Sequence, residues 1–397
     1  MINRKAYELG LKRSVIREIF EYGKKRAAEI GAENVYDFSL GNPSIPGPPI
    51  VKETLIRLVH EEDYVNLHGY TSAQGDLKCR EKIAESLNLR FDLRVSAEDL
   101  YLTCGAAACL TITLRALCNE GDEVVVFAPY FPEYREFTAA AGAELVAVKP
   151  DSCFMPDFEA FERALNPKTK AVIVNSPNNP SGVVYDEDTI VRLAEILKKK
   201  SEQFKKTVYL ISDEPYRELV YDKRTEVPFL TKYYKETVVC YSYSKSLSLP
   251  GERIGYILIN PEAPDKKDLY AAVCGAGRLM GYVCAPSLFQ RVVAHCDGKT
   301  GDLNAYKRNR DLLYKALSVY GFDCIYPDGA FYLFVKAPGG DAEKFCEAAK
   351  KKEILIVPGS GFGCPGYVRI AYCVDEEKIV RALPVFKELA KEYGLQK

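Results

Sequence analysis

The sequence predicts an α/β protein with a mostly parallel central sheet sandwiched by helices, plus a smaller α+β domain. Between about residues 100 and 260, short β-branched runs alternate with longer amphipathic segments. This pattern is typical of parallel strands that are buried on both faces. The chain has 397 residues, 47% of them hydrophobic, whereas a single core stops growing at roughly 250–300 residues. We therefore expect one large and one smaller domain.

The predicted elements follow one another in a clear order. Apolar residues at helical spacing among charges predict an amphipathic helix over residues 13–30. The Gly/Pro-rich stretch 41–49 predicts a crossing between domains. The predicted strands cover residues 100–102, 123–127, 145–148, 171–174, 208–211, 238–240, 254–259, 330–335 and 367–371.

This order predicts how the chain divides. Residues 44–290 hold the run of buried strands and form the large domain. Residues 291–397 return to amphipathic helices with few strands, and we assign them to the small domain. The N-terminal segment 1–43 precedes the domain crossing and is expected to belong to the small domain as well.

Composition and charge exclude several classes of protein. The chain carries 54 basic and 55 acidic residues, without the basic patch that nucleic-acid or membrane-surface binding needs. No apolar run approaches the ~20 residues that span a bilayer, so we expect a cytoplasmic protein. The thirteen cysteines show no C-x-x-C spacing and the three histidines are scattered. We therefore expect reduced thiols and no metal site.

Residues that follow the predicted strands are candidates for a ligand site, because open α/β sheets bind ligands outside the carboxyl ends of their strands. After 100–102, the small residues Gly105, Ala106 and Ala107 open a helical stretch whose N–H groups can approach an anion. After 123–127, Phe131 offers a ring that can stack on a flat heterocycle. An ordinary tight turn and core aromatic residues are the alternatives.

The later strands add polar groups of different chemistry. Asn179 lies in a rigid Asn/Pro turn, and Asp213 ends a buried strand, where a carboxylate needs a cationic partner. Lys245 is flanked by hydroxyl residues between two strands, where an amine can form a Schiff base. Taken singly, these could be a turn former, a surface pair and a solvated lysine. Together they fit one ligand, pyridoxal 5′-phosphate (PLP), a phosphorylated aromatic aldehyde with a phenolic oxygen and a ring nitrogen.

The order of these motifs resembles that of the class I/II aminotransferases of fold type I, the aspartate aminotransferase family. The resemblance runs from Gly41-Asn42-Pro43 to Arg369. It implies that Lys245 forms the Schiff base with PLP and shuttles the substrate proton, and that Asp213 pairs with the pyridinium nitrogen. It further implies that Asn179 and Tyr216 hydrogen-bond the phenolic oxygen, while Phe131 stacks on the ring.

The resemblance also implies how the two charged ends of the ligands are held. The cofactor phosphate would be bound by the Gly105-Ala106-Ala107 turn, Ser242 and Arg253, with Tyr70 reaching in from a second subunit of a homodimer. The substrate α-carboxylate would be gripped by Arg369, with help from Asn179 and the backbone of Gly41.

Two features depart from or extend the family pattern. The turn before the phosphate-binding helix reads Cys104-Gly105-Ala106-Ala107, where the family usually has a polar residue and two glycines, so we expect backbone donors alone there. Arg278 is the one cation in a Gly-rich stretch, at about the place where some family members bring an arginine from the partner subunit. The hypothesis is that Arg278 selects a dicarboxylic substrate such as aspartate.

The sequence therefore predicts a PLP-dependent aminotransferase that moves the amino group of an L-amino acid to a 2-oxo acid. A carbon–sulfur β-lyase of the same fold is the alternative, since it uses the same cofactor and motifs. A non-catalytic PLP sensor would need a helix-turn-helix domain, and only about 40 residues precede Gly41. A nicotinamide dehydrogenase would need G-x-G-x-x-G after its first strand, which is missing here.

Overall fold

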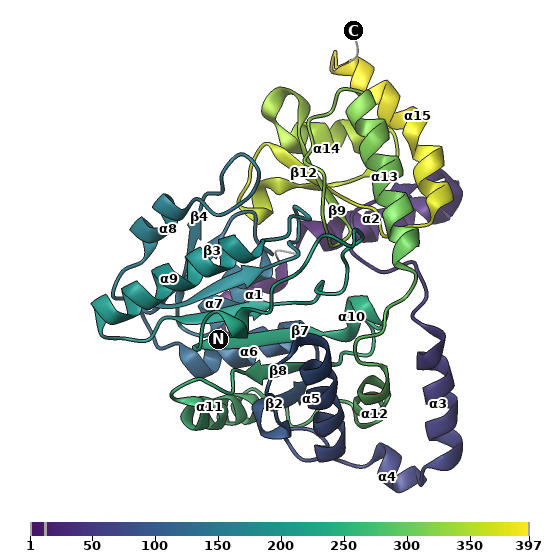
Figure 1. The fold of residues 1–397 in the computed structure, drawn as a ribbon. Coiled ribbons are helices and arrows are strands. Elements are labelled where there is room, and N and C mark those ends of the chain that lie inside the picture. Colours follow the sequence, from purple (N-terminus) through teal and green to yellow (C-terminus); the bar gives the residue numbers. More distant parts are fainter. Residues whose placement is uncertain (1, 12–13, 396–397) are drawn as a thin grey trace.

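The protein is built around a seven-stranded sheet, shown in Figure 1 of a computed structural model that describes residues 2–11 and 14–395. The strand order is β2-β8-β7-β6-β5-β3-β4. Every pair from β7 to β4 is parallel, whereas β8 runs antiparallel to both β2 and β7. The mostly parallel sheet is therefore confirmed. The strands are β2 (Leu100–Thr103), β3 (Glu123–Phe127), β4 (Glu144–Val148), β5 (Thr169–Asn175), β6 (Tyr209–Asp213), β7 (Thr237–Ser242) and β8 (Gly255–Ile259).

Both faces of this sheet are buried. Along β8, Tyr256 and Leu258 pack into one apolar cluster, while Ile257 and Ile259 pack into another. Since successive side chains of a strand point to opposite faces, helices must cover both sides. The helices of this part of the chain are α3 (Pro49–Glu61), α4 (Tyr64–His68), α5 (Leu77–Phe91), α6 (Ala106–Leu117), α7 (Glu133–Ala140), α8 (Phe158–Ala164), α9 (Glu187–Phe204), α10 (Tyr243–Ser246), α11 (Lys266–Leu279) and α12 (Ser287–Cys296).

The last third of the chain forms a second layer with its own apolar cluster. Its three-stranded antiparallel sheet has the order β11-β12-β9. Figure 1 shows α13, α14 and α15 around this sheet, with α2 close by. The elements are β9 (Tyr332–Lys336), β10 (Ile354–Leu355), β11 (Val357–Pro358), β12 (Tyr367–Ala371), α13 (Leu303–Val319), α14 (Ala342–Lys350) and α15 (Glu376–Glu392).

The N-terminal segment is tied to this second layer by strand pairing. Strand β1 (Tyr36–Asp37) runs parallel to β10, and Arg26 of α2 (Val15–Ile30) pairs with Glu353 at 2.7 Å. The short helix α1 (Arg4–Leu11) precedes α2 and buries no side chain. The domain boundaries at residues 43 and 290 stay predictions.

Two predicted elements begin two residues later than the sequence indicated. The strand predicted at 330–335 starts at Tyr332, because Ala330 has a φ of 56° and so cannot continue an extended strand. The helix predicted over 13–30 starts at Val15, and Ser14 caps it by accepting a hydrogen bond from the Arg17 N–H. Residue 13 lies outside the described part of the chain. Within the described residues, no helix has the length and apolar character needed to cross a membrane.

Candidate active site

A cavity of about 270 Å³ lies where β5, β6 and β7 end and α6 begins. Most of the side chains singled out from the sequence meet there, although they come from both ends and the middle of the chain. Tyr70, Gly105 and Arg278 do not line it. The predicted residues that do are Gly41, Ala106, Ala107, Phe131, Asn179, Asp213, Tyr216, Ser242, Lys245, Arg253 and Arg369.

Lys245 reaches the cavity from the short helix α10, which follows β7 directly. Ser242 caps this helix, since its Oγ accepts a hydrogen bond from the Ser244 N–H. The Lys245 Nζ donates to the Gly41 carbonyl oxygen at 2.5 Å. Burial lowers the pKa of Lys245 to about 8, with a further lowering from the Arg369 and Arg253 charges. A larger share of this amine is therefore unprotonated near neutral pH than for an ordinary lysine.

Asp213 is the last residue of β6 and is 4% exposed. Its Oδ2 accepts a short hydrogen bond from the Tyr134 hydroxyl, whereas its Oδ1 is buried and has no partner in the structure. Burial raises the pKa of Asp213 to about 7, although the Tyr134 hydrogen bond opposes the shift. A buried carboxylate oxygen without a partner fits a cationic ring nitrogen.

Asn175 fixes the neighbouring turn relative to this carboxylate. Its Nδ2 donates to the Asp213 carbonyl oxygen at 2.8 Å, and its Oδ1 accepts from the Asn179 N–H at 2.8 Å. The pairing of Asn175 with Asp213 in the β5–β6 register places both at the same sheet edge. The backbone at Asn179 is therefore held in place by the residue that ends β5.

Hydrogen-bond donors gather at the start of α6. Gly105 has a φ of +80°, which turns the chain from β2 into this helix. The Arg253 guanidinium lies beside the turn, 3.0 Å from where a Cβ on Gly105 would be, and donates to the Pro250 carbonyl oxygen. The Ser242 and Ser244 hydroxyls lie 2.7 Å apart and also belong to this end of the cavity. A helix N-terminus, a guanidinium and hydroxyls together suit a phosphate group.

Arg369 of β12 marks another wall of the cavity and is 2% exposed. One guanidinium nitrogen donates to Asn179 Oδ1 at 3.1 Å and another to the Ser39 carbonyl oxygen at 2.5 Å, while its buried Nε has no partner. The Tyr332 ring lies 4.6 Å from its guanidinium carbon. A buried guanidinium with an unused donor suits a carboxylate ligand.

Tyr332 also explains why residue 41 is a glycine. A Cβ on Gly41 would lie 1.9 Å from the Tyr332 hydroxyl oxygen. That hydroxyl is 2.9 Å from the hydroxyl of Tyr216. The close approach lets the Gly41 carbonyl reach Lys245, since any side chain here would push the two segments apart.

Sequence reasoning missed several residues in and around the cavity. Tyr134 does not line the cavity but donates a hydrogen bond to Asp213, a contact that only the fold reveals. Asn175 and Ser244 lie close in sequence to predicted site residues but had no role assigned to them. Tyr332 fell within a predicted strand. The other missed lining residues are Ile16, Leu40, Leu110, Pro215 and Pro250.

Tyr70 and Arg278 lie outside the cavity of the single chain. Tyr70 follows α4 and is 94% exposed. Arg278 is exposed near the end of α11. The single chain does not bring either residue to the cavity that Lys245 lines.

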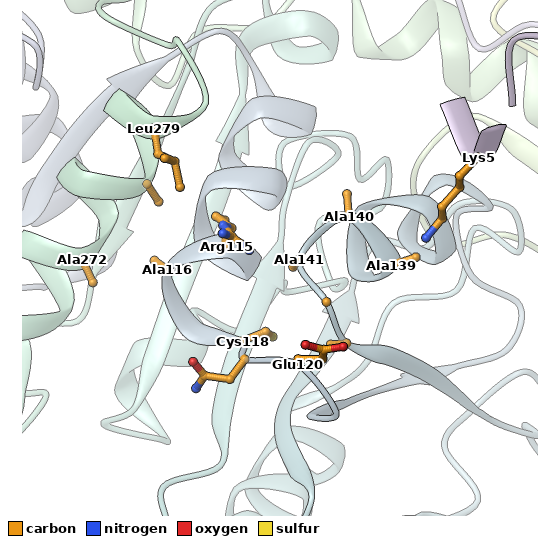
Figure 2. A pocket seen from close by; sticks show the side chains of 14 residues that line it. Lys5, Arg115, Ala116, Cys118, Glu120, Ala139, Ala140, Ala141, Ala272 and Leu279 are labelled. Atoms are coloured by element: carbon orange, nitrogen blue, oxygen red, sulfur yellow. The ribbon is translucent and has the colours of Figure 1, made fainter. Parts of the chain in front are cut away.

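A larger cavity of about 740 Å³ lies elsewhere, among α1, the ends of α6 and α7, and α11. Figure 2 shows alanine side chains along its wall, with Lys5, Arg115 and Glu120 among its few charged groups. None of the residues predicted to bind a ligand lines it. The convergent amine, carboxylate and guanidinium groups belong to the smaller cavity, which is therefore the candidate active site.

The fold and this cavity define an α/β enzyme with a lysine, a carboxylate and an arginine gathered at the ends of parallel strands. Residues 32–386 match the family model described as aminotransferase class I and II, and the chain belongs to that family. The aspartate aminotransferase of Thermotoga maritima is 30% identical over 390 residues, which cover 96% of this chain and 97% of the relative.

Solved structures agree with this assignment. An amino transferase from Eubacterium rectale is 58% identical and superimposes with a TM-score of 0.96 over 99% of both chains. The aspartate aminotransferase of Thermus thermophilus, solved with maleate, gives a TM-score of 0.86 at 26% identity, over 98% of this chain and 99% of the other. The protein is thus a transaminase of fold type I, as the resemblance implied, and this family uses PLP.

Proposed function

We propose that this chain binds PLP in the 270 Å³ cavity and moves the amino group of an L-amino acid to a 2-oxo acid there. The observation that carries the proposal is the unpaired, buried Oδ1 of Asp213 in the same cavity as Lys245 and Arg369. When bound, PLP supplies an aldehyde that condenses with amines and a ring that accepts the electron pair left by the departing α-proton.

Lys245 would act as the nucleophile and as the base. With its pKa lowered to about 8, its Nζ can attack a carbonyl carbon and can move a proton between the substrate α-carbon and the reacting carbon of the cofactor. Asp213 would keep the ring nitrogen protonated, and Tyr134 would hold the carboxylate in position. Phe131, which lines the cavity, would stack on the ring.

The two ends of the ligands would be bound by separate sets of donors. The backbone after Gly105, with Ser242 and Arg253, would hold the phosphate. Arg369 would bind the substrate α-carboxylate through its free Nε, with Asn179 fixing the guanidinium. Tyr216 and Asn179 would donate to the phenolic oxygen of the cofactor.

A homodimer would complete the site with Tyr70 from the second subunit. Support comes from apolar side chains that are exposed on α3 and α4 and around the end of α11, since exposed apolar side chains often mark protein interfaces. A second copy of the chain would cover such side chains. The exposed residues include Ile56, Val59, Tyr64, Val65, Leu279, Met280 and Val283.

Arg278 would then select the substrate side chain from across the interface. Support comes from the relatives, since the Thermotoga enzyme is an aspartate aminotransferase and the Thermus enzyme was solved with maleate, a dicarboxylate. We expect Arg278→Ala to lower turnover of aspartate relative to alanine by about tenfold or more, because the distal carboxylate loses its partner. An unchanged aspartate-to-alanine ratio would remove the proposal.

Absorption spectra of the PLP-loaded protein test the proposed function. A single L-amino acid added without a 2-oxo acid should remove the visible band, and a 2-oxo acid should restore it. Borohydride followed by peptide mass spectrometry should place the cofactor on Lys245. Pyruvate and ammonia released from cysteine while the band persists would instead favour a carbon–sulfur lyase. Nothing in the site or in the relatives favours that alternative.

A further inference from the structure

Two buried tyrosines lie at the start of the helix that carries Lys245. Tyr241 is in β7 and Tyr243 is the first residue of α10. Their rings lie 5.0 Å apart, edge to face, and Tyr241 also stacks on Tyr256 at 4.9 Å. All three rings are at most 1% exposed. The tyrosine rings therefore hold the backbone where β7 passes into α10, and each hydroxyl reaches a carboxylate on another segment.

Each of the two hydroxyls binds a different buried carboxylate. The Tyr241 hydroxyl donates to Glu218 Oε2 at 2.8 Å, and the Tyr243 hydroxyl donates to Asp297 Oδ1 at 2.8 Å. The side chains of Glu218 and Asp297 are 9% and 1% exposed. Glu218 follows β6 and Asp297 follows α12, so the contacts tie α10 to two segments far apart in the chain.

One arginine joins the two carboxylates. Arg90, at the end of α5, lies 3.1 Å from Glu218 Oε1 through one terminal nitrogen and 3.0 Å from Asp297 Oδ2 through the other. The two ends of its planar guanidinium thus hold two carboxylates at a fixed separation, which a lysine ammonium cannot do equally well. Helices α5 and α12 pack against each other beside the sheet (Figure 1).

The network ends at the neighbour of Lys245. The Ser246 Oγ lies 2.9 Å from the Tyr241 hydroxyl oxygen. An ionised carboxylate only accepts hydrogen bonds, so the single proton of Tyr241 goes to Glu218 and the Ser246 hydroxyl must donate to Tyr241. Donors and acceptors therefore alternate without a break from Ser246 through Tyr241 and Glu218 to Arg90.

We propose that Arg90 is a positioning residue, which acts through Glu218, Asp297 and the two tyrosines to hold α10 so that Lys245 Nζ is aligned for the reaction. The inference rests on the proposed function, since it assigns the support of the same lysine. Neither Arg90 nor the two carboxylates line the cavity. Their effect on the reaction is therefore indirect.

Loss of Arg90 would change the hydrogen bonds at α10. Burial raises the pKa of Glu218, and Arg90 is the main group that holds it down. Without the guanidinium, two buried carboxylates would lie close together with one cation fewer, so one of them would take up a proton. A protonated Glu218 can donate to Tyr241, which would reverse the direction of the bonds that reach Ser246.

The test compares Tyr243→Phe, Arg90→Met and Arg90→Lys in the full-length, PLP-loaded protein. Tyr243→Phe removes one hydroxyl and keeps the ring, so it should fold even if Arg90→Met does not. Tyr234→Phe is the matched control, because this buried tyrosine donates to the Val208 carbonyl oxygen away from the cavity. The readouts are kcat and KM for the amino donor, the pH midpoint of the visible band, and thermal unfolding.

If Arg90 positions Lys245, Tyr243→Phe and Arg90→Met lower kcat by about tenfold or more, since small misplacements of a reacting group are that costly. The KM for the donor stays within about twofold, because Arg369 is untouched. The pH midpoint of the visible band moves by at least about half a unit, and Arg90→Lys retains more kcat than Arg90→Met.

An unchanged kcat and midpoint in folded Tyr243→Phe would overturn the inference. The inference would also be overturned if Tyr243→Phe and Arg90→Met lost thermal stability but kept the same kcat and pH midpoint as the control Tyr234→Phe. The network would then serve stability alone. Failure of the proposed function would look different, since the wild-type protein itself would then show no visible band and no borohydride-trapped cofactor on Lys245.

Discussion

Asp213 enters the cavity with one oxygen held by Tyr134 and the other unpaired, and this arrangement has a consequence for the cofactor-free protein. Its pKa is about 7 in the fold, so between about pH 4 and pH 7 the folded protein holds a proton that the unfolded chain releases. The free energy of unfolding must therefore fall as pH rises through this window, and the full penalty is present above about pH 7.

Asp213→Asn should remove this penalty. We expect the cofactor-free variant to be more stable than wild type at pH 8, on the order of 2–4 kcal/mol from the raised pKa. The advantage should be smaller at pH 5. The same variant should lose most transaminase activity, because a neutral amide cannot keep the ring nitrogen protonated. Urea unfolding at both pH values, with and without PLP, measures these effects.

Asp99 provides the matched control for this substitution. It is also a buried carboxylate, 1% exposed, but it pairs with Lys266. Asp99→Asn should therefore destabilise the protein at both pH values, since it leaves the lysine without its partner. An Asp213→Asn protein no more stable than wild type at pH 8 would contradict a buried, unpaired Asp213.

At the scale of elements, buried strands were predictable and short or bent ones were not. All seven strands of the large sheet lie within two residues of their predicted bounds, because continuous apolar runs between helices have few other interpretations. The two-residue strands β1, β10 and β11 were missed, since two residues carry no periodicity. The start of β9 was placed two residues early because Ala330 adopts a left-handed conformation that its sequence does not reveal.

The candidate site likewise contains residues that the sequence reveals and residues that only the fold reveals. Lys245 and Asp213 were predicted because each comes shortly after a recognisable strand, whereas Arg369 was predicted because the resemblance to the family implied it. The supporting groups depend on contacts between distant segments, such as Tyr134 with Asp213 or Arg90 with Asp297. A single sequence gives no signal for such pairs until the fold places them together.

The turn from β2 into α6 depends on the glycine at position 105. Gly105→Ala should lose about 1–3 kcal/mol of stability, because its φ of +80° is a region that favours glycine. It should also weaken PLP binding by about tenfold, equivalent to 1.4 kcal/mol, since its Cβ would lie 3.0 Å from the Arg253 guanidinium. Thermal unfolding and a PLP titration measure the two effects separately.

Gly121 separates backbone strain from the loss of the site. It has a φ of +83° with no atom within 4 Å of an added Cβ. Gly121→Ala should therefore show a similar loss of stability with unchanged PLP affinity. Equal PLP affinities for both variants would show that the α6 turn tolerates a side chain, and would argue against this turn as the phosphate site.

At the scale of the whole molecule, the candidate site exists only when the entire chain is folded. Gly41 comes from the N-terminal segment, Lys245 from the middle and Arg369 from the last strand. The pairing of β1 with β10 brings the N-terminal segment back to the last third of the chain. The exposed position of Tyr70 extends this dependence to a second subunit under the proposed dimer.

Hybrid dimers test whether Tyr70 acts across the interface. Tyr70→Ala and Lys245→Ala should each be nearly inactive as homodimers. If the two residues of one site come from different subunits, a hybrid has one site with both residues intact. Random mixing makes half of the dimers hybrid, so unfolding and refolding an equal mixture should restore about a quarter of wild-type activity.

Asp213→Ala mixed with Lys245→Ala is the control, because both residues line the same chain's cavity and no hybrid site is intact. Recovery in the first mixture alone supports the shared site, whereas no recovery in either would show that Tyr70 does not serve the neighbouring subunit.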